Sequence, residues 1–298
     1  MLVTRLKSVQ NHAATKVRCR AISEDDLEQV AALLAKGFSG RSKSYWIQGL
    51  ERLRHRRMPD GLQRFGYALE VEGQIAGTLL LVASTRVIEG KPESFANVAA
   101  WYVEPAYRGS AQLLVSVGLR NRDITYLNVT PAPHTWPIVE SQGYTQYCAG
   151  LFFALAPLAA PARNTVIERL EAEGVETLPE YPMLREHANY GCTALVCRDD
   201  EGHHPFLFRP FRIRSGRIWT PAVLAIYARS QTELVRFAGN IGRHFMARGM
   251  PVIAVDADRP IAGLPGYFTA RRGRKYFKGP NPPRLCDLTG TELAIFGP

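Results

Sequence analysis

Hydrophobic and polar residues alternate regularly along the chain from residue 17 onwards, and the alternation predicts short strands and helices. An apolar strand over 17–22 is followed by Ser23 and three acidic residues, which supply the cap and the acidic first turn of a helix. That helix is expected to reach about Gly37. A second helix is predicted over 44–57, because Pro59 disfavours helix in the residue before it.

The middle of the first half has the pattern of a β-hairpin. Two strand-like runs within 67–82 flank Glu72-Gly73, a pair of residues suited to a tight turn. The predicted elements that follow are a strand over 95–103, a helix over 111–119, a strand over 124–129, a short helix over 136–142, and a strand after Gly143-Tyr144. This order predicts an α/β chain of the α+β kind, built on a mixed sheet.

The second half repeats this plan in weaker form. The interval from the hairpin glycine to the tyrosine at the end of the next strand is 29 residues in the first half, from Gly73 to Tyr102. It is 25 residues in the second half, from Gly202 to Tyr227, and a helix over 231–248 follows. Similar intervals indicate an internal duplication.

The length of 298 residues also favours two domains of about 150 residues each. Residues 1–16 are interpreted as an N-terminal extension and 17–155 as the first domain. The Pro- and Ala-rich stretch 156–163 is predicted to be a linker, and 164–298 the second domain.

Charge and cysteine content narrow the class of protein only slightly. The net charge of +10 is shared equally between the two halves, so the surface attracts anions such as nucleic acid or the phosphates of a cofactor. Five scattered cysteines, without a C-x-x-C pair or histidines at metal-ligand spacing, indicate reduced thiols and no metal. The chain has no long apolar run and no signal-peptide pattern, so we expect a cytoplasmic protein without a membrane span.

The stretch 101–114 carries the most specific chemistry. A strand stops at Pro105, and a helix begins just after Arg108-Gly109. The start of a helix offers unpaired N–H groups to a phosphate, and small residues leave room for its approach. The proline favours separation from the neighbouring strand, which opens a gap for an extended pantetheine-like arm. From the pattern alone, an ordinary strand-to-helix turn fits as well.

The residues Val103-x-Pro105-x-Tyr107-Arg108-Gly109, followed by a helix with Leu113-Leu114, resemble the acyl-CoA motif of the GNAT superfamily of N-acyltransferases. The resemblance covers roughly residues 17–150. In that family an Arg or Gln is followed, after two residues, by Gly, one further residue, and Gly or Ala. Those positions here are Arg108, Ala111 and Leu113, and Leu113 departs from the pattern.

The resemblance implies two tandem GNAT-like domains. The first would bind acyl-CoA, and the second would be degenerate, because its corresponding turn over 229–233 has neither proline nor glycine. It also implies the positions that contact the cofactor. These are the backbone of Tyr102 and Val103 for the pantetheine amides, and Arg108, Gly109, Ser110, Ala111, Gln112 and Leu113 around the pyrophosphate.

Acyl transfer to an amine needs a base for the ammonium proton and a proton donor for the leaving thiolate. We expect Glu104 to be the base, with His134 as the second candidate and Glu140 as the third, although Glu104 and His134 also suit plain solvent-exposed positions. The tyrosine that many relatives use as the proton donor is replaced by Val139, so Tyr144, Tyr147 or a water is the candidate donor. Tyr45 and Trp46 are expected to line the acceptor pocket, or alternatively to belong to the core.

The predicted function is transfer of an acetyl or other acyl group from acyl-CoA to a small-molecule amine, with an amino sugar as the first choice. Two alternatives remain open. One is an aminoacyl-tRNA-dependent peptidyltransferase of tandem GNAT-like type, which would bind nucleic acid through the basic runs 52–57 and 271–278. The other is a non-catalytic module that binds CoA or a polyanion.

Overall fold

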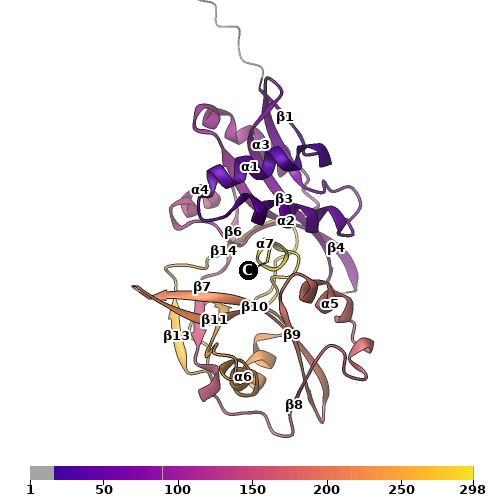
Figure 1. Ribbon diagram of the computed structural model, residues 1–298, viewed down its shortest axis with the longest axis vertical. Helices are drawn as coiled ribbons and strands as arrows, with labels where there is room; N and C mark the ends of the chain where they lie inside the picture. Colours follow the sequence, from indigo (N-terminus) through magenta and orange to yellow (C-terminus); the bar gives the residue numbers. More distant parts are fainter. Residues whose placement is uncertain (1–16, 89, 216, 298) are drawn as a thin grey trace, which may run out of the picture.

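The computed structural model describes residues 17–88, 90–215 and 217–297, and contains two seven-stranded mixed sheets (Figure 1). The first sheet lies in the upper part of Figure 1 and the second in the lower part. The mixed α/β prediction and the duplication are both confirmed. Each sheet contains a single parallel strand pair among the described residues, and all its other pairs are antiparallel.

The first sheet has the strand order β1-β2-β3-β4-β5-β14-β6. The predicted hairpin turn is confirmed, because Glu72 and Gly73 both have positive φ, at 50° and 81°. The bounds of its strands are β1 Val17–Ala21, β2 Gly66–Val71, β3 Gln74–Ile88, β4 Lys91–Val103, β5 Thr125–Asn128, β14 Lys275–Lys278 and β6 Thr145–Cys148.

Helices cover both faces of this sheet. Apolar side chains of α1 (Leu27–Gly37) and α2 (Lys43–His55) pack on one face, together with Ile295 and Phe296 from the end of the chain. On the other face, α3 (Ala111–Gly118) and α4 (Trp136–Ser141) pack in two smaller clusters. We refer to the α1–α2 side as the front face. The short helix α7 (Glu292–Ile295) lies at the centre of Figure 1, between the two sheets.

The second sheet has the order β13-β7-β12-β11-β10-β9-β8. Its parallel pair, β11 with β12, corresponds to β4 with β5 in the first sheet. The bounds of its elements are β7 Gly150–Ala154, β8 Val166–Glu168, β9 Thr193–Asp199, β10 Gly202–Ser215, β11 Ile218–Ala228, β12 Val252–Ala257, β13 Gly266–Thr269, α5 Tyr181–Asn189 and α6 Gln231–Met246.

The two halves exchange strands. β7 follows β6 directly along the chain but pairs with β12 and β13 of the second sheet. β14 comes from residues 275–278 and pairs with β5 and β6 of the first sheet. The sheets therefore do not divide at the expected boundary near residue 155. Each half is completed by a segment from the other.

The stretch that was predicted to be a linker is packed against α6. Ala156 and Ala159 are buried, and a Cβ atom at Gly242 of α6 would lie 2.4 Å from the carbonyl carbon of Ala156. Asn240 accepts a hydrogen bond from the N–H of Ala162 at 2.8 Å. The close approach of Gly242 to Ala156 leaves no room for a side chain at position 242. Together with the Asn240 hydrogen bond, it holds the stretch 156–163 against α6.

No helix among the described residues combines the length and apolarity needed to cross a membrane. The five cysteines are unpaired thiols, and four of them are buried.

Candidate active site

The parallel strands β4 and β5 stay paired for only three residues. Their register runs from Phe95 opposite Thr125 to Asn97 opposite Leu127. Beyond Asn97, β4 continues against β3 through a bulge in which Ala100 has a φ of 45°. A positive φ at a residue other than glycine costs energy and is concentrated at functional sites. We call the place where the two strands part the β4–β5 opening.

The carboxylate of Glu292 lies across the β4–β5 opening. It accepts a hydrogen bond from the amide nitrogen of Asn97, a fully buried residue of β4. It also accepts a hydrogen bond from the hydroxyl of Thr130, just after β5, at 2.5 Å. Glu292 is half-buried, and the loss of surrounding water raises the pKa of its carboxyl group. This side chain therefore connects the two strands where they separate.

Two arginines hold α7, and with it Glu292, in position. Arg52 of α2 donates to the carbonyl of Ile295 at 2.8 Å. Arg209 of β10 donates to the carbonyls of Leu293 and Gly297, both at 2.8 Å. Cations are favourable at a helix C-terminus, where carbonyl groups lack partners within the helix. One arginine comes from each half, so the position of α7 depends on both.

The turn expected to bind phosphate is wound as a 3-10 helix over Pro105–Ser110, which leads into α3. Arg108 is exposed and has no ion-pair partner within the described ranges, and no heavy atom lies within 4 Å of a Cβ built on Gly109. These features fit a phosphate group. The N–H of Ala111 already donates to the carbonyl of Arg108, and Leu113 is 39% exposed beside it.

The three catalytic residues predicted from the sequence lie apart from Glu292. Glu104 forms an ion pair with Lys36 at 2.5 Å, at the end of β4. His134 is exposed, in the turn before α4. Tyr144 is buried against Val139 in the core behind the sheet, and burial raises its pKa. No hydrogen bond or ion pair joins any two of these residues in the part of the chain that the structure describes.

The aromatic residues predicted for the acceptor pocket lie on the front face. Trp46 is buried, with its ring edge-on to Phe296 at 5.9 Å between centroids. Tyr45 is half-buried, and the guanidinium of Arg41 lies 4.4 Å from the centre of its ring. The Tyr102 ring packs over Gly37, where a Cβ would be 2.4 Å away, while Val103 is buried. Trp46 is therefore part of the core, and Tyr45 is partly accessible.

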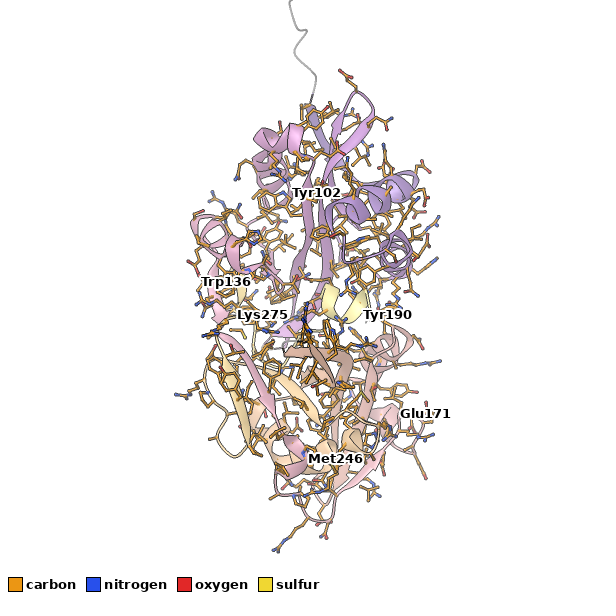
Figure 2. The ribbon with its side chains drawn as sticks, turned by 60° about the vertical axis from the view of Figure 1, so that its left-hand side comes forward. Tyr102, Trp136, Glu171, Tyr190, Met246 and Lys275 are labelled. Carbon is orange, nitrogen blue, oxygen red and sulfur yellow. The ribbon has the colours of Figure 1, made fainter. Side chains whose placement is uncertain are left out.

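A cavity of about 260 Å³ lies beside the opening, between the two halves. Thr130 and Leu293 form part of its wall, so it adjoins the residues that contact or follow Glu292. Arg272, Arg274 and Lys275 line another part. Figure 2 shows Trp136 and Lys275 near the level where the halves meet, on the opposite side of the yellow α7 from Tyr190. The remaining apolar wall comes from Val129, Pro131, Pro133, Trp136, Leu151, Phe211 and Leu224.

Sequence reasoning missed Glu292 and this cavity. The available signal was a single carboxylate directly before the apolar run Leu293–Phe296, a position where an unpaired charge is costly once the run is buried. Over the described residues, no cluster of three or more histidine, cysteine or acidic side chains has a geometry that would hold a metal ion.

No protein-family model matches the sequence, and no curated protein matches it. Several solved structures have a similar fold. A GCN5-related N-acetyltransferase from Anabaena variabilis superimposes with a TM-score of 0.56 and 16% identity, covering 88% of this chain and 72% of that one. A GCN5-related N-acetyltransferase from Kribbella flavida superimposes with a TM-score of 0.56 and 15% identity, covering 88% of this chain and 71% of that one. Eis1 from Mycobacterium abscessus superimposes with a TM-score of 0.53 and 15% identity, covering 92% of this chain and 74% of that one.

These similarities establish the class of fold. The chain has the fold of the GNAT superfamily, in two tandem GNAT-like domains. At this level of identity the likeness concerns the fold, and the chemistry has to be argued from the site itself.

Proposed function

We propose that the first domain transfers an acyl group from acyl-CoA to the amine of a small molecule. The observation that carries the proposal is the β4–β5 opening, with the half-buried Glu292 carboxylate held across it by Asn97 and Thr130. A separated strand pair followed by a helix start suits an extended thioester donor. A carboxylate that is held in place by two hydrogen bonds at the same opening suits removal of a proton from the acceptor.

The donor side would use the turn before α3. Arg108 would attract the pyrophosphate, and the N–H groups of Gly109, Ser110 and Gln112 would donate to it, next to the open space around Gly109. The backbone of Tyr102 and Val103 would pair with the amides of the pantetheine arm. Bound acyl-CoA supplies the activated acyl thioester. Acetyl is the simplest acyl group and is the one to test first.

The acceptor arrives as an ammonium ion, which must lose a proton before its nitrogen can attack. We assign this step to Glu292, because its raised pKa brings its proton affinity closer to that of an amine. Asn97 and Thr130 orient the carboxylate. Glu104 is less suited, since Lys36 neutralises it. His134 remains a secondary candidate.

The reaction balances with one base and one proton donor. The acceptor nitrogen forms a bond to the acyl carbon, and the carbon–sulfur bond of the thioester breaks. One nitrogen proton passes to Glu292, and a second ends on the leaving sulfur. A water molecule in the opening would carry the second proton, since Tyr144 is buried in the core behind the sheet and does not reach the opening.

The test is isothermal titration of acetyl-CoA into the wild-type chain and into Arg108→Glu in moderate salt. We expect the wild type to bind and the substitution to abolish or strongly weaken binding. Arg120→Glu is the matched control, because it makes the same charge change at an exposed arginine outside the turn. Failure of the wild type to bind either acetyl-CoA or a longer acyl-CoA would overturn the proposal.

The RNA-dependent alternative loses support from the contacts of the basic run 52–57. Arg52 donates to the carbonyl of Ile295, Arg54 pairs with Glu24, and Arg56 pairs with Glu186. These arginines bind other parts of the chain. They are therefore not a free cationic surface for a phosphate backbone.

A further inference from the structure

We propose that the cavity beside Glu292 binds the acceptor, and that the acceptor is an apolar α-amino acid or another apolar amine that carries a carboxylate. This inference rests on the proposed function for the identity of the reacting group, the amine. It adds the chemical class of the molecule that carries the amine.

The apolar walls of the cavity favour an acceptor with an apolar side group. Leu151, Phe211 and Leu224 come from the second half, whereas Val129 and Trp136 come from the first. The volume of about 260 Å³ lies just below the usual range of about 300–1,000 Å³ for ligand sites. It suits one aromatic or branched aliphatic group and is too small for an oligosaccharide. Burial of such a group supplies binding energy without needing a polar partner.

The charged residues around the cavity specify an anionic group. Arg272 is exposed, and neither it nor Arg274 has an ion-pair partner among the residues the structure describes. The guanidinium of Arg274 stacks 4.1 Å from the centre of the Trp136 ring, and its buried Nε has no hydrogen-bond acceptor. This guanidinium lies over an aromatic ring and hydrogen-bonds the Tyr276 side chain, and its other N–H groups are donors that a carboxylate can accept from.

The distribution of charge around the cavity also argues against an acceptor that is cationic and has no anionic group. No aspartate or glutamate is found among the described residues that line the cavity. Lys275 is already neutralised by Asp256, at 2.7 Å. An amino sugar such as glucosamine carries no carboxylate to pair with Arg272 and Arg274, and its hydroxyl groups would face the apolar wall. The amino-sugar preference suggested by the sequence is therefore replaced by an anionic, apolar acceptor.

Thr130 links the cavity to the proposed base. Its side chain donates to the Glu292 carboxylate, and the residue forms part of the cavity wall. A ligand with its apolar group among Phe211 and Leu224 and its carboxylate at the arginines has its amine left to face this wall. An α-amino acid carries these three groups on one carbon atom, so it matches the three features of the site.

The first experiment compares acceptors that differ in one group. Phenylalanine, phenethylamine and glucosamine are offered with saturating acetyl-CoA, and thiol release is measured. We expect kcat/KM for phenylalanine to exceed that for phenethylamine by about tenfold or more, as befits a charge-assisted pair. Glucosamine should be the poorest acceptor. Equal or better use of phenethylamine, or a preference for glucosamine, would overturn the inference.

The second experiment removes the cations one at a time. Arg272→Ala and Arg274→Ala should each lower kcat/KM for phenylalanine several-fold and leave the value for phenethylamine within about twofold. Arg271→Ala is the matched control, since Arg271 is the exposed neighbour that does not line the cavity. An unchanged ratio of the two substrates in both variants contradicts a role for the arginines.

A binding measurement separates this inference from the proposed function. N-acetylphenylalanine, the expected product, is titrated without CoA, and the tryptophan fluorescence is followed. Binding that weakens in Arg272→Ala supports the cavity assignment even if acyl transfer is never observed. Turnover of other amines without any binding of N-acetylphenylalanine leaves the acyltransferase proposal standing and overturns the acceptor class.

Discussion

The two halves of the molecule contain the same parallel strand pair but treat its open end differently. β4 and β5 are paired over three residues, as are β11 and β12. In the first half the strands part after Asn97 and Leu127, and a single side chain, that of Glu292, spans them. In the second half the strands part after Leu224 and Ala254, and the chain itself lies alongside β11.

The segment in the second half forms backbone hydrogen bonds that an extended ligand would otherwise form. The N–H of Ala228 donates to the carbonyl of Cys286 at 3.0 Å, and the N–H of Leu288 donates to that of Ile226 at 2.8 Å. A bridge between Tyr227 and Asp287 continues the pairing. The same strand arrangement can therefore leave its polar backbone groups to a ligand or use them within the chain. This comparison supports the interpretation of the second half as degenerate.

The largest expected effect tests the side chain in the first opening. Glu292→Gln should lower kcat for acyl transfer by about 10²- to 10⁴-fold, the usual contribution of a general base. The dissociation constant for acetyl-CoA should stay unchanged. Glutamine can still accept a hydrogen bond from Asn97, and removing a charge with a raised pKa should not lower the thermal midpoint.

Glu104→Gln is the control for that substitution, because it removes a carboxylate from the same region that is already paired with Lys36. A larger loss in Glu104→Gln than in Glu292→Gln would transfer the role of base to Glu104. A pH profile adds an independent readout. The base must be unprotonated, so kcat/KM should fall as the pH drops through a midpoint above 4.5, the ordinary value for glutamate.

The next effect concerns the ion pair that joins the halves. Lys275 on β14 of the first sheet and Asp256 on β12 of the second are both buried, 2.7 Å apart. Lys275→Met leaves Asp256 buried without its partner and should cost about 3–5 kcal/mol in the free energy of unfolding. Urea unfolding measures this loss. Replacing both residues, with Asp256→Leu added, should recover most of it, and an equally unstable double variant would contradict this explanation.

A smaller effect is confined to the first half. Arg20 binds the carboxylate of Asp26 at 2.6 Å and lowers its pKa from 3.8 to about 2. The ion pair adds about 2 kcal/mol to the free energy of unfolding above pH 3.8, and this stabilisation is lost as the pH falls through about 2. Asp26→Asn should remove this pH dependence. The measurement is urea unfolding at several pH values between 2 and 5, and identical pH dependence in the two proteins would refute the assignment.

The smallest expected effect compares the two turns directly. Arg229 follows β11 as Arg108 follows β4, but it is paired with Glu180 at 2.7 Å. Arg229→Gln should therefore change the dissociation constant for acetyl-CoA by no more than about twofold in calorimetry, unlike Arg108→Glu. A comparable loss in both variants would show that the second turn also contributes to binding.

Local patterns in the sequence were sufficient to predict most helices and strands of the first half and its GNAT-like fold. The alternation of apolar residues and the Glu72-Gly73 turn correctly indicate β1 to β4, and the resemblance at Arg108-Gly109 indicates the GNAT-like arrangement. Those features depend on residues close together in the chain. They also locate the candidate phosphate turn, whose ligand remains a prediction.

The exchanged strands and the proposed base are beyond such patterns. β14 pairs with β5 across about 150 residues, and no local feature of Lys275–Lys278 specifies that partner. Glu292 lies about 195 residues from Asn97 in the chain and reaches it through α7, which Arg52, Arg209 and the buried Ile295 and Phe296 hold in place. Glu104 and Tyr144 were chosen for their closeness in sequence to the motif, and closeness in sequence does not bring their side chains to the opening.

The strand exchange has a consequence for synthesis of the chain. The first sheet lacks the strand between β5 and β6 until Lys278 has left the ribosome, and β7 has no partners until β12 and β13 have followed. During most of translation, β5 and β6 therefore have edges without a partner, which are sites for mispairing. The two sheets are therefore completed at nearly the same stage of synthesis, after β12, β13 and β14 have been made. A nascent chain of this kind depends more than an ordinary tandem protein on factors that shield strand edges.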